Sequence, residues 1–287
     1  MTTLETVRKG QTTIAPGGLA HELRATTMVW RRELIRFRHD RTRMLAMLLQ
    51  PVLFLFVLGT GLSSVISTGT EIDFRTFLFP GVLAMSVLFS AAFAGISLVW
   101  DREFGFLREM LVAPVSKSAI ILGKCLGGAT TATLQTLVLL ALAGLVGVPY
   151  NLMLFLSLLG LLFVGALMLT ALGVLLSARV KQIQAAMPLS QLIITPMMFL
   201  SGALFPMANL PGWLAVLTKI NPLTYVVQPM RSVVFDYLTL PATARAAFNP
   251  AITWGAWTVP LGVQVLVAVA CTAGLVAAGI AVFNRTD

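Results

Sequence analysis

The sequence has little charge, and ionisable side chains are almost missing from its long apolar stretches. Only 11% of the 287 residues are charged, whereas 57% are hydrophobic and the mean hydropathy is +0.90. A water-soluble domain with a polar shell cannot have this balance. The composition therefore excludes an ordinary soluble protein and indicates that the chain lies in a lipid bilayer.

Six windows are long and apolar enough to cross the hydrocarbon layer, which takes roughly 20 residues of helix. They cover residues 44–66, 77–100, 119–146, 152–178, 185–205 and 257–283. The only ionisable side chain inside them is Lys124, which is one turn from a window end and is expected to extend to the lipid headgroups. The preceding residues lack the apolar core of a signal peptide, so we expect the first span to be retained. The sequence predicts an all-α integral membrane protein with six transmembrane helices.

Most of the positive charge lies on one side of these six spans. The formal net charge is +9, and with the N-terminus inside, 16 of the 20 Lys and Arg residues fall in inner segments. The four outside are Arg75, Lys219, Arg231 and Arg245. This split follows the positive-inside rule and predicts that both termini are cytoplasmic. The basic charge is thus a sign of topology, and we expect no binding of nucleic acid.

The sequence lacks the residues that an energy-coupling or catalytic site would need. Gly123 and Lys124 do not complete a Walker pattern, because Ser118 stands where its first glycine should be. His21 and His39 precede the first window, and no Asp or Glu lies inside any window. This argues against an ion-coupled carrier, a metal site and an intramembrane hydrolase. We expect a chain that is no enzyme and has no catalytic residue, metal or cofactor of its own.

The polar side chains inside the windows are neutral. They are Thr130, Thr131, Thr133, Gln135, Thr136, Ser190, Gln191, Thr195, Ser201 and Gln264. We expect most of them to form hydrogen bonds between helices and others to face a cavity. Gly123 and Gly127, or Gly274 and Ala278, would allow close helix contact. Cys125 and Cys271 also lie within windows, so we expect two buried thiols and no disulfide.

The N-terminal region has two parts. Residues 1–18 are polar with several glycines, which predicts a mobile cytoplasmic tail. In residues 19–43, arginines alternate with apolar side chains at helical spacing, namely Leu23, Trp30, Leu34 and Phe37. The pattern predicts a basic amphipathic helix before the first span. It is compatible with a helix in the headgroup layer that contacts a cytoplasmic partner, and equally with a simple membrane anchor.

The inner loop after the second window, residues 101–114, mixes five charges with large apolar side chains. Phe104, Leu107 and Leu111 would share one face of a short helix that Pro114 ends. Such a helix at the membrane surface is suited to docking into a groove of a partner protein. The alternative is a helix that rests on lipid.

The longest outer segment, residues 206–255, contains two apolar pieces at 213–217 and 225–235. Both are too short to cross the bilayer, which favours re-entrant or interfacial helices packed against the spans.

Two ordered motifs make the chain resemble the type-2 permease family of ABC exporters, in particular the daunorubicin-resistance type of bacterial drug-efflux permease. The first is the inner helix followed by Leu-Val-Ala-Pro-Val-Ser at 111–116. The second combines Ser-Gly-Ala-Leu-Phe-Pro at 201–206, Leu-Pro-Gly-Trp at 210–213, Asn-Pro-Leu-Thr-Tyr at 221–225 and Arg231. The likeness extends over nearly the whole chain, so residues 44–287 are expected to form a six-span type-2 permease domain like that of the ABC G subfamily.

The resemblance implies a pair of permeases, identical or paralogous, with two copies of a separate ATPase subunit that holds ATP and Mg. It implies a connecting helix with Leu23, Trp30, Leu34 and Phe37, and a coupling helix over residues 103–111. The residues it assigns to coupling are Arg102, Glu103, Phe104, Leu107, Arg108 and Leu111. It also implies that the outer motif with Asn221, Pro222, Tyr225 and Arg231 caps the exit. Relatives in animals carry outer cysteines that this chain lacks, so no disulfide is implied there.

The resemblance further implies a substrate cavity between spans two and five. Helical spacing selects Phe89, Phe93, Gln191, Thr195, Met198 and Phe199 as its lining. The absence of charge there favours a hydrophobic or amphipathic drug, with lipid or cell-surface glycan as the alternative. Abundant Ala and Arg with little Lys are typical of a high-GC bacterium, which suggests a bacterial inner membrane. An energy-independent channel or a membrane scaffold is the alternative from another functional class.

Overall fold

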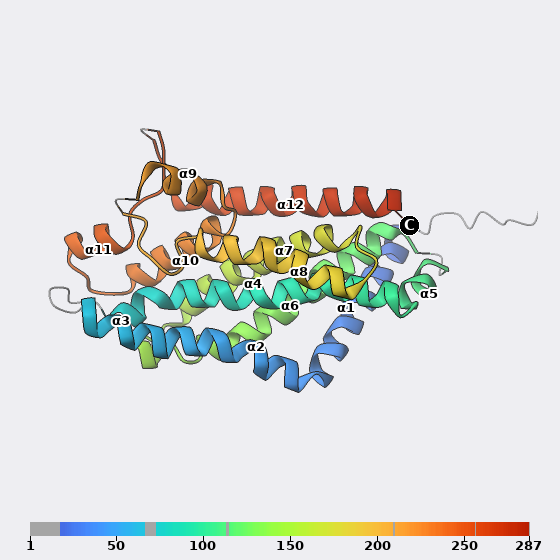
Figure 1. The fold of residues 1–287 in the computed structure, drawn as a ribbon, viewed down its shortest axis with the longest axis horizontal. Coiled ribbons are helices and arrows are strands. Elements are labelled where there is room, and N and C mark those ends of the chain that lie inside the picture. Colours follow the sequence, from blue (N-terminus) through green and yellow to red (C-terminus); the bar gives the residue numbers. More distant parts are fainter. Residues whose placement is uncertain (1–17, 67–72, 113–114, 209, 256, 287) are drawn as a thin grey trace, which may run out of the picture.

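The protein is described by a computed structural model that covers residues 18–66, 73–112, 115–208, 210–255 and 257–286. Its long helices run side by side along an elongated bundle (Figure 1). The helices are α1 (Leu19–His39), α2 (Arg41–Leu53), a π-helical turn (Phe54–Leu58), α3 (Gly59–Ile66), α4 (Phe74–Glu103), α5 (Phe106–Val112), α6 (Lys117–Leu140), a 3-10 turn (Ala143–Val146), α7 (Leu152–Ser177), α8 (Ile183–Phe199), α9 (Gly212–Ile220), α10 (Thr224–Asp236), α11 (Ala242–Phe248) and α12 (Leu261–Thr286). Strands β1 (Thr253–Trp254) and β2 (Trp257–Thr258) form a small antiparallel hairpin. The all-α prediction is confirmed apart from this hairpin, and the predicted tail lies outside the described residues except for Gly18.

Within the described residues, four helical segments are long and apolar enough to cross a membrane. They are Arg41–Ser63, Phe74–Glu103, Leu152–Ser177 and Leu261–Arg285. Helix α8 is apolar but has only 17 residues, and α6 has 24 residues with Lys124, glycines and threonines among its apolar side chains. These four candidate spans agree with the predicted multi-pass membrane protein, and the crossings by α6 and α8 stay predictions.

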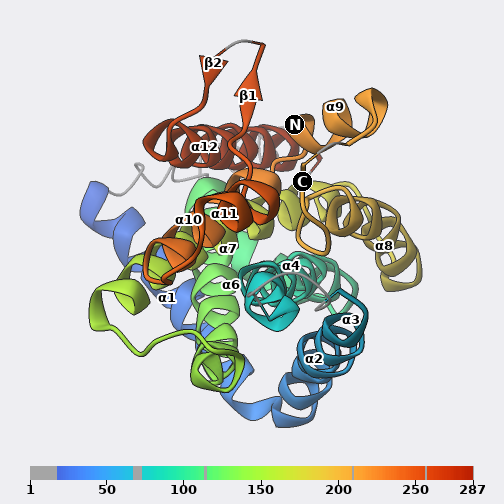
Figure 2. The same cartoon turned by 90° about the vertical axis from the view of Figure 1, so that its left-hand side faces the viewer.

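Helix α4 is the centre of the bundle, with α6, α7 and α8 packed around it (Figure 2). In its most apolar stretch, 83% of the residues are buried, against 22% for the first span and 17% for α12. The most extensive contact of α4 is with α7, where a methyl group on Gly95 would lie 2.3 Å from the carbonyl carbon of Gly173. The two backbones approach this closely because neither residue has a side chain.

Helix α1 lies along α6, and the glycines of α6 allow the contact. A methyl group on Gly123 would come 2.6 Å from Cβ of Val29, and one on Gly127 would come 2.6 Å from Cβ of Glu33. The predicted close contact is confirmed for Gly123 and Gly127, whereas a methyl group on Gly274 of α12 would meet no described atom within 4 Å. The amphipathic helix is shorter than the expected 19–43, because it ends at His39 and the Asp40 carboxylate then accepts a hydrogen bond from a backbone N–H of α2.

Three predicted windows extend beyond their helices. The third includes the 3-10 turn, the fifth continues past Phe199 into a turn, and the sixth begins in β2 rather than at Leu261. In the fifth, Gly202 has a positive φ of 70° and the Ser201 hydroxyl donates to the carbonyl of Met198, which ends the helix. Apolar composition alone did not reveal these ends, because the turns are as apolar as the helices.

The outer segment folds onto the bundle as α9, α10, α11 and the hairpin. Helix α10 is largely buried and contacts α4, α7 and α12, whereas the apolar side chains of α9 are mostly exposed. Two separate helices thus account for the two apolar pieces that the sequence indicated. Their depth relative to a bilayer stays a prediction.

Candidate functional site

Lys124 on α6 lies at the centre of a buried group of charges. Its ammonium group is 2.9 Å from Oε1 of Glu33 on α1 and 2.5 Å from Oδ2 of Asp101 on α4, and it donates to the hydroxyl oxygen of Ser97 at 3.1 Å. Only 2% of Lys124 is exposed. The expectation that it extends to lipid headgroups is therefore wrong. Two carboxylates on neighbouring helices neutralise it, so it lies inside the protein.

Asp101 joins this lysine to the basic face of α1. Arg32 donates to both carboxylate oxygens of Asp101, at 2.8 and 3.2 Å, and Arg36 has a nitrogen 3.7 Å from Oδ1. A paired guanidinium and carboxylate in this geometry is among the stronger polar contacts in proteins. Arg32 and Arg36 thus face protein rather than lipid phosphate. We call the five residues Glu33, Arg32, Arg36, Asp101 and Lys124 the charged cluster.

Arg32 also extends the cluster to the short helix α5. Its guanidinium carbon lies 5.7 Å from the ring centre of Phe106, and Nη1 is 3.4 Å from the sulfur of Met110. These contacts combine a cation over an aromatic ring with a weak sulfur acceptor. One side chain of α1 therefore contacts α5 and, through Asp101, α4 and Lys124 of α6.

The predicted coupling helix is interrupted. Helix α4 continues to Glu103, and Gly105 then turns the chain with a φ of 83° before α5 begins. Phe104 lies in this turn and is 66% exposed, whereas Leu107 is 2% exposed and packs against Leu98 and Phe283. The expectation of one helical face shared by Phe104, Leu107 and Leu111 is wrong for the first two residues, and the side chain of Leu111 lies outside the described atoms.

Arg102 and Glu103 hold the connection between α7 and α8 against the end of α4. Arg102 donates to the carbonyls of Ala178 and Val180 at 2.9 and 2.7 Å. The carboxylate of Glu103 accepts from the backbone N–H of Ile183 at 2.8 Å, at the first turn of α8. Two loops predicted to be cytoplasmic are thus joined, while the Arg108 side chain stays exposed.

The apolar residues predicted for the connecting helix are buried to different degrees. Trp30 donates from its indole to the Thr130 hydroxyl of α6 at 3.1 Å, and Leu34 and Phe37 are half-buried. Leu23 is mostly exposed. Polar pairing between helices, expected for the neutral side chains, is confirmed for Thr130, for Gln135 with Ser90 and for Thr136 with Ser86.

The predicted cavity residues lie on two neighbouring helices, α4 and α8. Phe89 and Phe93 are half-buried beside other apolar side chains, and Met198 is buried. Gln191 is exposed and donates to the Thr195 hydroxyl at 2.8 Å, and Phe199 is half exposed. The residues lie on adjacent helices, as expected for spans two and five. Their contact with cargo stays a prediction.

The outer motif is a hydrogen-bonded support for the outer helices. Asn221 donates to the carbonyl of Met197 at 2.7 Å, which fixes the end of α8, and the half-buried Pro222 follows it. Tyr225 donates to the carbonyl of Lys219 at 2.9 Å. Arg231 is fully buried, donates to the carbonyl of Gly202 at 2.7 Å and lies 4.2 Å above the ring of Phe77. These contacts give Asn221, Tyr225 and Arg231 a structural role, and capping of an exit by the motif stays a prediction.

Sequence reasoning did not identify Glu33 and Asp101. Glu33 is an acidic residue within a run of arginines on α1, and Asp101 directly follows the second apolar window. Either acidic residue could have been predicted as a buried partner of Lys124, because Lys124 is the only charge within the windows. The pairing itself needs the packing of α1 on α6, which the sequence pattern did not reveal.

Four long apolar helices around a buried centre define an integral, multi-pass membrane protein. Residues 24–235 match the model of the ABC-2 type transporter family. The chain belongs to this family, which means that it is a transmembrane permease subunit without an ATPase domain and that permeases of this kind pair with ABC ATPase subunits.

This chain is similar to curated proteins that include transport permeases. The chain is similar to the putative transport permease ycf38 of Pyropia yezoensis, with 30% identity over 72% of this chain and 70% of the relative. It is similar to nodulation protein J of Rhizobium leguminosarum bv. viciae, with 28% identity over 77% and 85%. It is also similar to the probable multidrug ABC transporter permease YbhR of Escherichia coli, with 30% identity over 54% and 42%.

Proposed function

We propose that this chain is the membrane subunit of an ATP-driven exporter that moves a hydrophobic or amphipathic compound out of the cytoplasm or the inner leaflet. The single observation that supports this most directly is the position of Arg32 between α5 and Asp101. A movement of α5 can reach the centre of the bundle through this one side chain. Two copies of a separate ATPase, holding ATP and Mg, supply the movement.

The ATPase contacts the exposed part of the turn and α5. This surface consists of Phe104, Phe106, Arg108, Glu109 and Val112, which combine apolar area with both signs of charge. Leu107 lies on the buried side of α5, so it supports this helix and does not itself contact the ATPase. Closure of the ATPases moves α5, and the charged cluster transmits this to α4 and α6.

The experiment is to co-express the permease with its ATPase and measure assembly and ATP-dependent transport. Arg32→Gln should preserve assembly, because the docking surface is unchanged, and reduce transport about tenfold, in line with losing a charge-assisted contact of roughly 1.5–3 kcal/mol. Arg31→Gln is the matched control, since Arg31 is the exposed neighbour. Normal transport with Arg32→Gln, or equal loss with Arg31→Gln, would contradict the coupling role.

We propose a drug or antibiotic as the cargo, bound between α4 and α8 of two permease copies. The support is the uncharged lining by Phe89, Phe93, Gln191, Met198 and Phe199, together with similarity to a relative named as a probable multidrug permease. Lipid or glycan is the alternative cargo. Accumulation of a labelled hydrophobic drug should rise when Phe93→Ala or Phe199→Ala replaces the wild type. Unchanged drug accumulation with altered export of lipid or glycan would favour the alternative.

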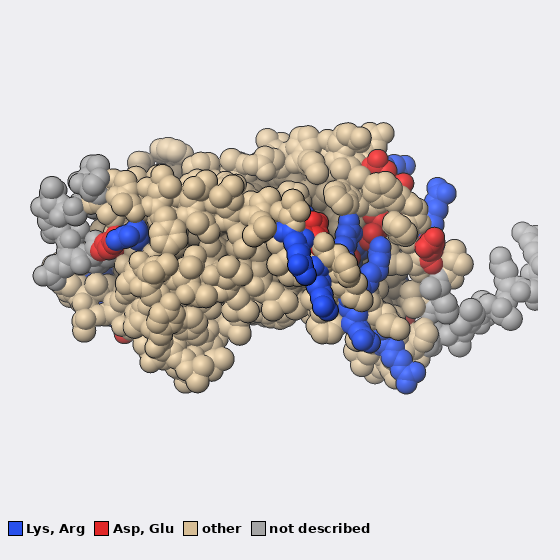
Figure 3. Space-filling model, turned by 90° about the horizontal axis from the view of Figure 1, so that it is seen from below, with Lys and Arg blue, Asp and Glu red and all other residues tan. Residues whose placement is uncertain are grey.

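We propose that the protein lies in a bacterial inner membrane with both termini in the cytoplasm. Most of the Lys and Arg side chains seen in Figure 3 gather at the end that carries α1 and α5, which is consistent with the positive-inside rule. Labelling of introduced cysteines from each side tests the orientation. Transport that persists after ATP depletion and ignores vanadate would instead indicate a channel.

A further inference from the structure

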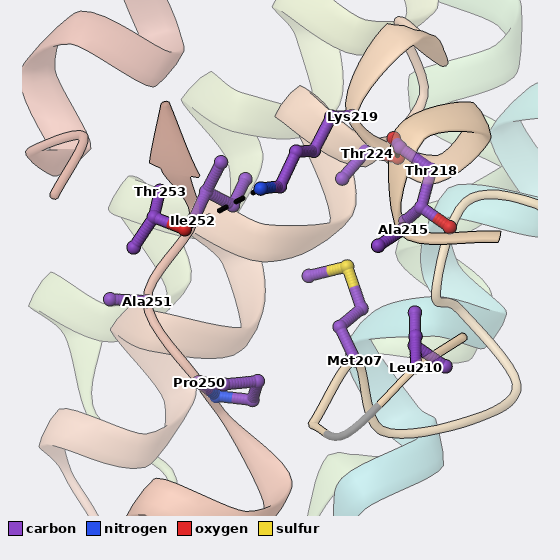
Figure 4. Close-up of a pocket in the computed structure, with 10 residues that line it drawn as sticks. All are labelled: Met207, Leu210, Ala215, Thr218, Lys219, Thr224, Pro250, Ala251, Ile252 and Thr253. Carbon is purple, nitrogen blue, oxygen red and sulfur yellow. Dashed lines mark hydrogen bonds between the residues drawn. The ribbon is translucent and has the colours of Figure 1, made fainter. Parts of the chain in front are cut away.

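A small cavity lies between α9 and the segment that leads into the β-hairpin. It has a volume of about 140 Å³. Its polar walls are formed by Thr218, Lys219, Thr224 and Thr253, and the other lining residues are apolar, as Figure 4 shows. The volume is far larger than one water molecule needs, but smaller than a typical pocket for a drug-sized ligand. It suits one compact chemical group.

The polar atoms of this cavity that remain free to donate come from two side chains. The Lys219 ammonium group lies 3.5 Å from the Thr253 hydroxyl oxygen, as the dashed line in Figure 4 marks. The hydroxyls of Thr218 and Thr224 already donate to backbone carbonyls. Among the described residues, no Asp or Glu lies within ion-pair distance of Lys219, and the cavity walls contain no carboxylate. The site therefore offers donors and positive charge to an anionic acceptor.

The opposite face of α9 is apolar and exposed. Trp213, Val216, Leu217 and Ile220 recur at helical spacing, with exposed fractions from 41% for Leu217 to 72% for Ile220. Lys219 is on the polar side of the same helix. This arrangement is typical of a helix that lies at the boundary between headgroups and acyl chains, where lipid phosphates are level with its polar side.

The hairpin adds two tryptophans to the same region. Trp254 and Trp257 are paired across the strands, their ring centres are 5.8 Å apart, and both are about half exposed. The candidate span α12 begins at Leu261, just after the hairpin, and α9 lies at this same end of the bundle (Figure 1). Tryptophan is the residue preferred at the interface between membrane and water. The predicted depth of the cavity is therefore that of the lipid headgroups.

We propose that this cavity binds the phosphodiester group of a membrane phospholipid, with Lys219 and Thr253 donating to its oxygens. The apolar face of α9 lies on the acyl chains of the same leaflet, and the two hairpin tryptophans lie at its interface with water. A lipid with net negative charge is preferred, because no carboxylate of the described residues pairs with Lys219. The site anchors the outer helices to the bilayer, and it is independent of the cargo and of the ATPase.

The test uses the full chain in nanodiscs made of equal amounts of phosphatidylglycerol and phosphatidylcholine. Native mass spectrometry after mild extraction should show phosphatidylglycerol retained preferentially, and Lys219→Gln should lower this retention about fivefold, the factor expected for one lysine at a charged membrane surface. Arg245→Gln is the matched control, because Arg245 is an outer cation that pairs with Asp236 away from the cavity. The control should retain lipid like the wild type.

Thr253→Val provides a second variant that keeps the charge, and it should weaken retention while leaving the fold intact. Retention unchanged in both Lys219→Gln and Thr253→Val would overturn the proposal. A free anion is the competing occupant. If millimolar inorganic phosphate displaces phosphatidylglycerol from the wild type while Trp213→Ser has no effect on retention, the cavity is a site for a soluble anion and the proposal is wrong.

Discussion

The ammonium group of Lys124 lies 2.9 Å from the Glu33 carboxylate, across the contact between α6 and α1. The two residues are 91 positions apart in the sequence, and Glu33 has no other hydrogen-bond partner among the described side chains. Because Asp101 has Arg32 as a second partner, Glu33 depends on Lys124 more than Asp101 does. Loss of Lys124 should therefore affect Glu33 more than Asp101.

Lys124→Met should destabilise the protein by about 3–5 kcal/mol, since it leaves the Glu33 carboxylate buried without a partner. Adding Glu33→Gln should recover part of that loss, because a neutral amide costs less to bury than a charge. Unfolding in detergent, followed by circular dichroism, measures both variants. Lys117→Met, at the first residue of the same helix, is the control. Purely additive effects of the two substitutions would contradict the pairing.

Gly95→Ala should destabilise the bundle by about 1–3 kcal/mol, because the new methyl group would collide with the α7 backbone at Gly173. Gly160→Ala on α7 is the matched control, since a methyl group there meets no atom within 4 Å. The control should be neutral or slightly stabilising, given the higher helix propensity of alanine. Equal thermal stability of the two variants would show that α4 and α7 are not in such close contact.

Gly105→Val should impair assembly with the ATPase or its coupling to transport, because valine does not readily adopt a φ of 83°. Gly105→Asn should behave nearly like the wild type, since asparagine tolerates this conformation. The ratio of transport to ATP hydrolysis in the reconstituted complex is the measurement. If valine and asparagine give the same ratio, the turn before α5 does not matter for coupling.

Asp73 should make stability depend on pH at the outer end of α4. Burial alone would raise the pKa of this carboxyl, but hydrogen bonds from Arg75 and Ser63 outweigh it and hold the pKa below its usual range. A lowered folded-state pKa adds stability that is present above the unfolded pKa and is lost as the pH falls through the folded value. Asp73→Asn should therefore flatten the loss of stability below about pH 4. Ser63→Ala removes one of these hydrogen-bond donors. It should also flatten the loss of stability at low pH, but by less than Asp73→Asn does.

The amino-acid sequence alone predicted a membrane protein without an ATPase domain, and the family match supports both predictions. The first prediction rests on long runs of apolar residues, and the second rests on the missing phosphate-binding loop. The amphipathic pattern of α1 and the glycines at Gly123 and Gly127 were also visible in sequence, because helical spacing is a local property.

Which charges meet depends on the tertiary structure. Lys124 could have extended to lipid or turned into the protein, and the choice depended on Glu33 and Asp101, which reach it through the packing of α1 and α4 on α6. The tertiary structure likewise placed Leu107 inside and Phe104 outside, because a positive φ at Gly105 ends the helical spacing on which the sequence prediction relied. Burying a charge is favourable only when its partner is in place, and partners distant in sequence come together only in the folded chain.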